Sequence, residues 1–388
     1  MTRQSQRWLA LPDVLTLLIL TGCVIAFSLT VAARDFLSYW AAGVQLVHHA
    51  SPYDAIAVEQ LQHSVGFGGR GIQLLMRNPP TALPLALPLG LFSYKLGGLL
   101  WSFALLVCLI ASVLAVRALE GHPANNLHIL AYCFGPAVAC LLTGQTPIFV
   151  LLGLVLFLRL HLSHPLAAGA SLWLCFLKPH LFLPFGVALL AWIIATRSYR
   201  ILIGAVGSLL VALALVMPFD PSCWTQYRQM MQASGIVNEF IPCWSDVFRR
   251  AIDPRAMWIQ FVPAALACVW ALWYFLRHRR HWSWIEHGSL LMIVSVLVAP
   301  YAWLIDQSVL IPALLHALYR SRSRAFAIVL GSASALIILQ IFLGASVHSR
   351  WNLWPAPLWL VWYLFAVKSG GTQPQPAGAA ASNTSPVA

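Results

Sequence analysis

Residues 14–33 form an apolar run without a charged residue, which is long enough to cross a membrane. A helix rises about 1.5 Å per residue, so about 20 residues span the ~30 Å hydrocarbon core. Further apolar segments recur as far as residue 367, and only 9% of the chain is charged, where soluble domains carry about 25%. The pattern predicts an all-α polytopic integral membrane protein with roughly 10–12 transmembrane helices.

The first apolar run also decides the domain organisation. It is longer than the ~7–15-residue core of a signal peptide, so we interpret it as a retained membrane helix. We predict one membrane domain over residues 1–368, with two long loops at 34–80 and 219–255. Residues 369–388 are uncharged and rich in Pro, Gly, Ala and Ser, which predicts a disordered tail.

The net charge of +12 reflects membrane topology. Its Arg residues are scattered through short loops and form no basic stripe, so no nucleic-acid partner is expected. If the N-terminus is cytoplasmic, the Arg-rich loops near 197, 279 and 322 are cytoplasmic too. Both long loops and most acidic residues then face the other side. We therefore predict cytoplasmic termini and an extracytoplasmic functional face in a bacterial-type inner (plasma) membrane.

Three junctions between apolar segments, near residues 145, 178 and 305, have almost no loop but do carry polar residues. Non-helical backbone at membrane depth is tolerated only where protein or a water-filled cavity covers it. Ionisable residues at such depth, here Lys178 and Asp306, are functional candidates by default. We expect a site at these junctions.

The first long loop begins with Asp35, directly where the first apolar run ends. Apolar residues then recur at helical spacing, which predicts a short interfacial helix; these are Phe36, Trp40, Val44 and Val47. A Ser-Pro turn at 51–52 separates it from a second short helix ending near His63. Residues 66–71 are Gly-rich, and Pro84 and Pro88 predict a broken segment over 82–92.

The motif Asp35-Phe36-x-x-Tyr39-Trp40-Ala41-Ala42-Gly43, followed by Ser51-Pro52-Tyr53-Asp54, resembles the first-loop signature of glycosyltransferase family 87. Further motifs follow in the order expected of that family: Asn78-Pro79-Pro80, Gly144-Gln145, Lys178-Pro179-His180, and Pro300-Tyr301 with Asp306. The resemblance implies a GT-C type fold, with interfacial helices and a catalytic Asp in the first extracytoplasmic loop. It also implies a polyprenyl-phosphate-mannose-dependent mannosyltransferase-like activity.

The chemistry agrees with the topology. Nucleotide sugars are cytosolic, so an extracytoplasmic transferase needs a donor that arrives in the membrane. A polyprenyl-phosphate sugar meets this need, and the acceptor is expected to be a glycolipid or glycan. The expected enzyme is a membrane hexosyltransferase, with mannose as the expected sugar and inversion of the anomeric centre.

The resemblance and this chemistry assign roles to individual residues. Asp35 is the candidate catalytic base, and Arg77, Lys178 and His180 are candidates for binding the donor phosphate. The candidates for sugar or acceptor binding are Tyr39, Asp54, Asn78, Gln145, Tyr301 and Asp306. The Asp and His residues are dispersed without metal-ligand spacing, so neither a metal nor another cofactor is expected.

Each assignment has an alternative. Asp35 and Asp54 could be helix caps, and the Lys178 side chain could extend to the membrane interface. Lys178 and Asp306 could instead line the path of a transporter or flippase for a lipid-linked or small polar solute. A non-catalytic relative that binds prenyl lipid is a third possibility. Within the loop 219–255, a disulfide between Cys223 and Cys243 is also open.

Overall fold

The computed structural model describes residues 11–30, 35–67, 74–321, 323–346 and 348–370. Within these ranges it contains helices and no strand, which confirms the all-α fold class. Five helical stretches are long and apolar enough to cross a membrane. They are α5 (Tyr94–Leu119), η3 with α10 (Pro179–Thr196), α11 (Tyr199–Val216), η4 to η5 (Met257–His281) and α17 (Arg324–Phe342). The chain is therefore a polytopic membrane protein.

The described residues contain further helices besides these five stretches. Along the chain they are α1 (Leu11–Thr30), α2 (Phe36–Val47), α3 (Ala55–Ser64), η1 (Pro80–Ala82), α4 (Leu83–Ala86), η2 (Leu87–Leu91), α6 (Ile129–Tyr132), α7 (Gly135–Thr143), α8 (Pro147–Leu160), α9 (Pro165–Cys175), α12 (Cys223–Ala233), α13 (Trp244–Ile252), α15 (His287–Leu297), η6 (Leu304–Leu310), α16 (Ile311–Arg320), η7 (Arg350–Asn352) and α18 (Pro355–Gly370). Two of the five long stretches consist of several helical pieces. Pro179–Thr196 combines η3 (Pro179–Phe182) and α10 (Leu183–Thr196), and Met257–His281 combines η4 (Met257–Phe261), α14 (Val262–His278) and η5 (Arg279–His281). The number of membrane crossings stays a prediction.

The helix breaks fall at the junctions predicted from the sequence. α7 ends at Thr143 and α8 begins at Pro147, α9 ends at Cys175, and α15 ends at Leu297. Prolines begin the next helices because their fixed φ suits the first turn and their missing N–H is not needed there. Pro occupies the first or second position of α7, α8, α9, α10, α14 and α16. Gly144 ends α7 with φ 72°, a left-handed conformation that favours glycine.

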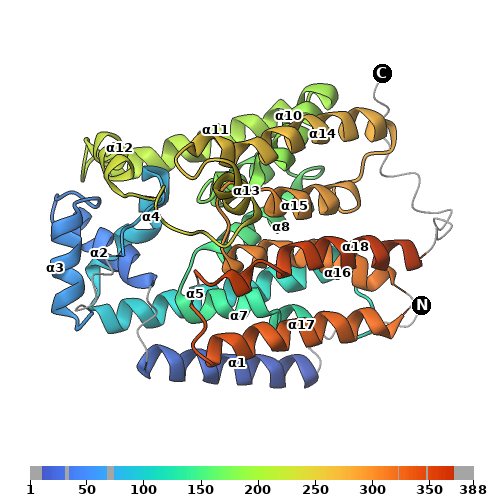
Figure 1. Cartoon of the computed structure of the whole chain (residues 1–388), viewed down its shortest axis with the longest axis horizontal. Helices are drawn as coiled ribbons and strands as arrows, with labels where there is room; N and C mark the ends of the chain where they lie inside the picture. The colour runs from blue at the N-terminus through green and yellow to red at the C-terminus, as the bar shows by residue number, and fades with distance from the viewer. Residues whose placement is uncertain (1–10, 31–34, 68–73, 322, 347, 371–388) are drawn as a thin grey trace.

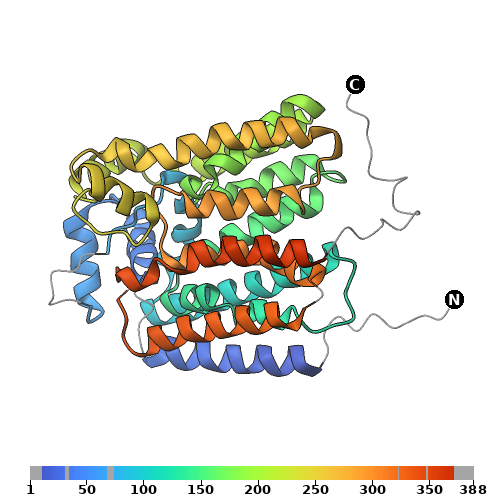
Figure 2. The same ribbon diagram turned by 45° about the vertical axis from the view of Figure 1, so that its right-hand side comes forward.

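The long helices run side by side in one bundle (Figures 1 and 2). The loop helices α2, α3 and α12 gather at one end, whereas α1 begins and α18 ends at the opposite end. The first described helix therefore starts on the same side of the bundle on which the last one finishes. The side of the membrane that the termini face stays a prediction.

The two short helices expected in the first loop are present, but α2 is more deeply enclosed than expected. An interfacial helix buries one apolar stripe, whereas α2 is buried all round over residues 36–43. The second side is covered by the broken segment 80–91, which approaches where Gly43 faces Gly90. A Cβ on Gly43 would lie 2.1 Å from the carbonyl oxygen of Ala86. The absence of side chains at both positions thus allows the backbones to touch.

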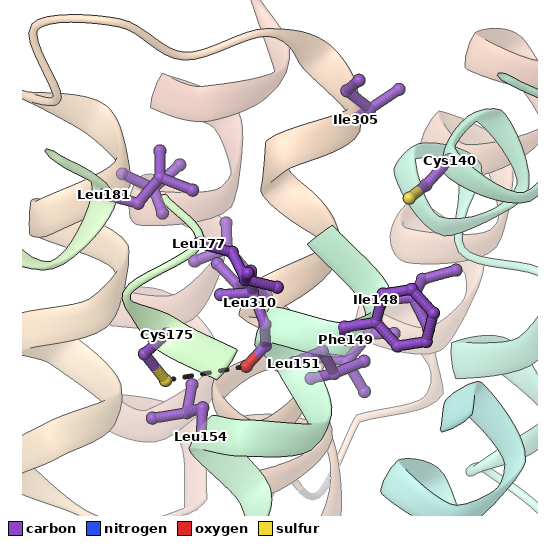
Figure 3. Packing of buried hydrophobic residues seen from close by; sticks show 14 of the residues in the cluster. Cys140, Ile148, Phe149, Leu151, Leu154, Cys175, Leu177, Leu181, Ile305 and Leu310 are labelled. Carbon is purple, nitrogen blue, oxygen red and sulfur yellow. Dashed lines mark hydrogen bonds between the residues drawn. The ribbon is translucent and has the colours of Figure 1, made fainter. Parts of the chain in front are cut away.

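The buried core continues beneath the helix breaks (Figure 3). Leu177 and Ile305, which directly precede Lys178 and Asp306 in the sequence, are 2% and 6% exposed. The polar junctions are therefore held in an apolar surrounding. Three predicted segments reach outside the described residues: the first apolar run 14–33 from residue 31 onward, the Gly-rich stretch 66–71 from residue 68 onward, and the tail from residue 371 onward. The tail prediction began at 369, but α18 continues to Gly370.

Candidate active site

Asp35 stands at the N-terminus of α2 and is fixed through its backbone. Its N–H donates to the carbonyl oxygen of Thr143 over 3.1 Å, which ties the first loop to the end of α7. Its own carbonyl oxygen accepts from the hydroxyl of Ser38 over 2.8 Å. The half-buried side chain makes no capping hydrogen bond to the first turn of α2. Asp35 therefore occupies the N-cap position of α2, but its side chain does not cap the helix.

Tyr39 links α2 to the junction between α7 and α8. Its hydroxyl donates to Oε1 of Gln145 over 3.0 Å, and its ring stacks on Trp101 with centroids 5.2 Å apart. Burial raises the pKa of the phenol far above its ordinary value, and the negative charge of Asp35 raises it further. Tyr39 consequently stays protonated and acts as a hydrogen-bond donor in this site.

Lys178 and Asp306 form a buried ion pair between the second and third junctions. The Nζ atom lies 2.6 Å from Oδ1 of Asp306, with the two side chains 9% and 0% exposed. Oδ2 of the same carboxylate accepts from the backbone N–H of Trp303 over 2.8 Å. The Lys178 ammonium also lies 5.9 Å from the centre of the Trp303 ring. Two residues distant in sequence are thus brought together.

His180 and Tyr301 extend this pair. Their rings meet edge to face with centroids 5.8 Å apart. The Nε2 atom of His180 is buried and has no hydrogen-bond partner in the described part of the chain. A buried ring nitrogen without a partner is costly unless a ligand or water supplies one. His180 is therefore suited to contact a bound molecule.

The groups around Asp35 and those around Asp306 belong to one neighbourhood. The end of α7 links them, because the backbone of Asp35 donates to Thr143 and α7 packs against η6, which carries Asp306. The buried thiol of Cys140 in α7 likewise lies within reach of the charges of Lys178, Asp306 and Asp35. The start of α2 therefore contacts the α7–α8 junction, and both α7 and α8 pack against η6.

Asn78 and Arg77 connect the first loop to other segments. The Asn78 side chain donates to the carbonyl oxygen of Leu177 over 2.9 Å, and Tyr53 donates to the Asn78 carbonyl over 2.9 Å. Arg77 forms a two-pronged pair with Glu239, one contact being 2.8 Å. The hydrogen bond from Arg77 lowers the pKa of Glu239 below its ordinary value. In this structure the Arg77 guanidinium thus binds a carboxylate from the loop 219–255.

Asp54 has a structural role as a helix cap. It is exposed, and its Oδ1 accepts from the backbone N–H groups of Ile56 and Ala57 over 2.9 and 3.2 Å. These bonds make it the N-cap of α3. Asp54 lies on the first loop, and its hydrogen bonds do not involve Lys178 or Asp306.

Sequence reasoning missed partners that come from distant segments. Glu239 pairs with Arg77, and Trp101 donates to the carbonyl oxygen of Gly144, but neither residue carries a local signal of these contacts. The buried Asp246 also binds Arg249 at 2.5 Å and Arg250 at 2.8 Å within α13. The spacing of these three residues on one helix was a usable signal. Cys223 and Cys243 are free thiols, so the structure shows no disulfide between them.

Comparison with known families adds an independent result. The sequence model of glycosyltransferase family 87 matches residues 77–300, which is more than half of the chain. The chain belongs to this family. The match includes Arg77, Asn78, Gln145, Lys178 and His180, whereas Asp35 and Asp306 lie outside it and are joined to it by the contacts above. No curated protein and no solved structure matches the chain.

Family membership and the apolar helical bundle together make this protein a membrane glycosyltransferase.

Proposed function

We propose that this family 87 glycosyltransferase moves a hexose, mannose in the first instance, from a polyprenyl-phosphate sugar to a hydroxyl of a glycolipid or glycan. The observation that carries the proposal is that the backbone of Asp35 is bonded to the end of α7, while α7 packs against η6, which carries Asp306 of the buried Lys178–Asp306 pair. A potential base and a potential phosphate-binding cation are thereby connected through one helix of a membrane protein. Membership of this family gives no support to the transporter alternative.

In the proposed reaction the carboxylate of Asp35 takes the proton of the acceptor hydroxyl. The acceptor oxygen forms a bond to the anomeric carbon while the bond from that carbon to the phosphate oxygen breaks. Polyprenyl phosphate leaves with the bonding electron pair. A single displacement of this kind inverts the anomeric centre. The phosphate is a good leaving group, so no separate general acid is required.

Lys178, Arg77 and His180 are proposed to hold the phosphate. The donor phosphodiester carries one negative charge, and the departing phosphate monoester gains a second. Cations beside it therefore bind the transition state more tightly than the donor, which is what accelerates the step. Lys178 and Arg77 are engaged with Asp306 and Glu239 in this structure. The donor phosphate would share these cations with the carboxylates or displace them.

The remaining candidates are proposed to position the sugar and the acceptor. Tyr39 and Gln145 present polar atoms beside Asp35, while Tyr301 and Asp306 do so beside His180. Asn78 acts by holding the backbone at Leu177. Asp54 would act on the acceptor only as an exposed group of the first loop.

The proposed orientation places this centre on the extracytoplasmic side and both termini in the cytoplasm of a cell with an inner (plasma) membrane. Single cysteines introduced in the loop at residues 60–67 should react with an impermeant thiol reagent added outside intact cells. Cysteines introduced at 279–281 should react only after the membrane is opened. The reverse pattern would remove the argument for a membrane-borne donor.

Asp35→Asn tests the catalytic assignment. Asn preserves the size of the side chain but cannot accept the proton, so the turnover should fall by about 10²–10⁴-fold. Binding of the donor should survive because the phosphate contacts lie elsewhere. Asp253→Asn is the matched control, because Asp253 is an exposed carboxylate in the other long loop.

The assay uses purified protein in nanodiscs with radiolabelled polyprenyl-phosphate mannose or glucose and a membrane extract as the acceptor. Transfer from mannose but not glucose would support the proposed sugar. Near wild-type turnover by Asp35→Asn would show that the base lies elsewhere. Transfer from neither lipid donor, with wild-type protein folded, would overturn the donor class.

A further inference from the structure

A polar cleft lies at the end of the bundle opposite α2 and α3. It has a volume of about 500 Å³ and is formed by α14, α15, α16 and α18. This size falls within the ~300–1,000 Å³ range of small-molecule sites. The cleft is lined near the end of α16 by Arg320 and near the end of α18 by Lys368. These helix ends lie far from the loop helices in Figures 1 and 2, so the cleft is separate from the proposed active site.

The charges on the cleft wall favour an anion. Among the lining residues, Arg320 and Lys368 contribute two permanent cations and Glu286 contributes one carboxylate, while a second carboxylate, Glu120, is hydrogen-bonded to His316. His287 and His316 add ring nitrogens that become donors when protonated. His316 is only 4% exposed, and its Nδ1 is held by Glu120 at 2.8 Å. That bond orients the ring and leaves Nε2 as the atom available to a ligand.

The pair of Arg320 and Glu286 does not close the cleft. The two side chains are hydrogen-bonded, but 34% and 45% of their surfaces remain exposed. Exposed ion pairs contribute only about 0–1 kcal/mol, so an incoming anion competes for Arg320 at little cost. Arg presents a fork that matches phosphate oxygens, and Lys adds a mobile point charge. Together they suit a phosphate group better than a neutral polar ligand.

The cleft is also amphipathic. Leu290, Leu364 and Val367 form an apolar part beside the charged groups, and the side chain of Leu364 is 48% exposed. The segment Arg279–His281, which ends the neighbouring α14 stretch, adds further exposed basic residues. His278, just before it, lies with its ring 5.3 Å from that of His287. Basic groups beside an apolar surface are typical of the pockets between membrane helices that bind the phosphate groups of lipids.

We propose that this cleft binds a phosphate-bearing ligand through Arg320, Lys368 and His316, on the side of the membrane opposite the transferase site. The same chemistry would accept the headgroup phosphate of an anionic lipid or a free phosphate compound. The proposal does not depend on the transferase mechanism.

The test uses the full-length purified protein. In one arm, native mass spectrometry measures how much phosphatidylglycerol or phosphatidylcholine the protein retains after purification from nanodiscs of each lipid. In the other arm, calorimetry measures the binding of inorganic phosphate in detergent. The variants are Arg320→Gln with Lys368→Gln, Glu286→Gln, and the control Arg324→Gln, an exposed Arg at the start of α17.

The double variant should weaken binding by at least about tenfold, since each charge-assisted contact is worth about 1.5–3 kcal/mol. Glu286→Gln should strengthen binding, because it removes the carboxylate that competes for Arg320. Arg324→Gln should change nothing. Opposite effects of Glu286→Gln and the double variant distinguish a ligand site from a merely structural ion pair, whose loss would act in one direction.

Retention of phosphatidylglycerol without a phosphate response would identify a lipid headgroup as the ligand. A phosphate response without lipid retention would identify a free phosphate compound. Binding of neither probe, equal retention of both lipids, or equal binding by the double variant would overturn the proposal. Transfer activity of the double variant should match that of the wild type, which verifies that the protein is folded.

Discussion

The buried pair of Lys178 and Asp306 gives the sharpest test of how this site is held together. Both side chains lie almost entirely out of solvent, with Nζ and Oδ1 only 2.6 Å apart. Removing one partner leaves an uncompensated charge in an apolar surrounding, which typically costs about 3–5 kcal/mol. We therefore expect Lys178→Met and Asp306→Asn each to lower the free energy of unfolding by about that amount.

The double variant separates charge from shape. Met occupies much of the volume of the Lys stem. In the wild type Asp306 accepts a hydrogen bond from the Trp303 N–H over 2.8 Å, and Asn at position 306 retains an oxygen that can accept the same bond. With neither charge present, no desolvated ion remains. The double variant should therefore be more stable than either single variant, because replacing a buried pair with neutral groups is often nearly neutral.

The measurement is equilibrium unfolding in mixed micelles of dodecylmaltoside and dodecylsulfate, with donor affinity determined in parallel. The double variant should recover stability but not donor binding, because the proposed phosphate contact of Lys178 is still missing. A double variant whose loss of stability equals the sum of the two single losses would show that the charges do not interact. Recovery of donor affinity along with stability would remove Lys178 from the phosphate site.

Three further changes test the surrounding contacts. Tyr39→Phe should cost about 1 kcal/mol in unfolding free energy by removing the bond to Gln145, and it should slow transfer; unchanged values of both would mean that α2 is held without it. Because Arg77 lowers the pKa of Glu239 in the folded state, the stability from their pair is present above the unfolded-state pKa and is lost as the pH falls through the folded value. After correction for the slower intrinsic exchange in acid, the protection of amides in residues 234–243 should then fall with the pH in the wild type but not in Glu239→Gln, and equal profiles would contradict the pairing. Gly43→Ala should cost at least about 1–3 kcal/mol, because the new Cβ meets the Ala86 carbonyl at 2.1 Å, whereas Gly186→Ala, with nothing within 4 Å, should be neutral or slightly stabilising.

Local features of the fold were predictable from the sequence. The helix breaks near 145, 178 and 305 followed from polar residues and prolines between apolar segments, and α2 and α3 followed from periodicity and the Ser-Pro turn. Lys178 and Asp306 were each identified as ionisable groups at membrane depth. These predictions succeeded because propensity, capping and hydrophobic period act within a few residues.

What the sequence left open depends on distant segments. Nothing local shows that Lys178 pairs with Asp306, or that Arg77 meets Glu239. The burial of α2 was underestimated because periodicity reports one apolar face, whereas the second face became buried only through its approach to residues 83–91. That approach depends on two glycines far apart in the chain, Gly43 and Gly90, and neither one alone predicts it.

The broken helices also explain why the candidate site can be rigid. A helix that stops at membrane depth leaves backbone groups without partners, and each must find one inside the protein. Trp101 donates to the Gly144 carbonyl over 2.7 Å, and Asn78 donates to the Leu177 carbonyl. Asp306 accepts from the Trp303 N–H, and Gln260 donates to the Pro300 carbonyl.

Each of these side chains belongs to a different part of the chain from the break it completes, except Asp306, which lies in the next turn. The breaks therefore cannot relax independently, since moving one would leave a buried polar group unpaired at a cost of about 1–3 kcal/mol. Residues that cross-connect the breaks thus fix the positions of Lys178, His180 and Asp306. The same irregular backbone that would be costly in lipid is, once satisfied in this way, a stable frame for polar chemistry at the edge of a membrane.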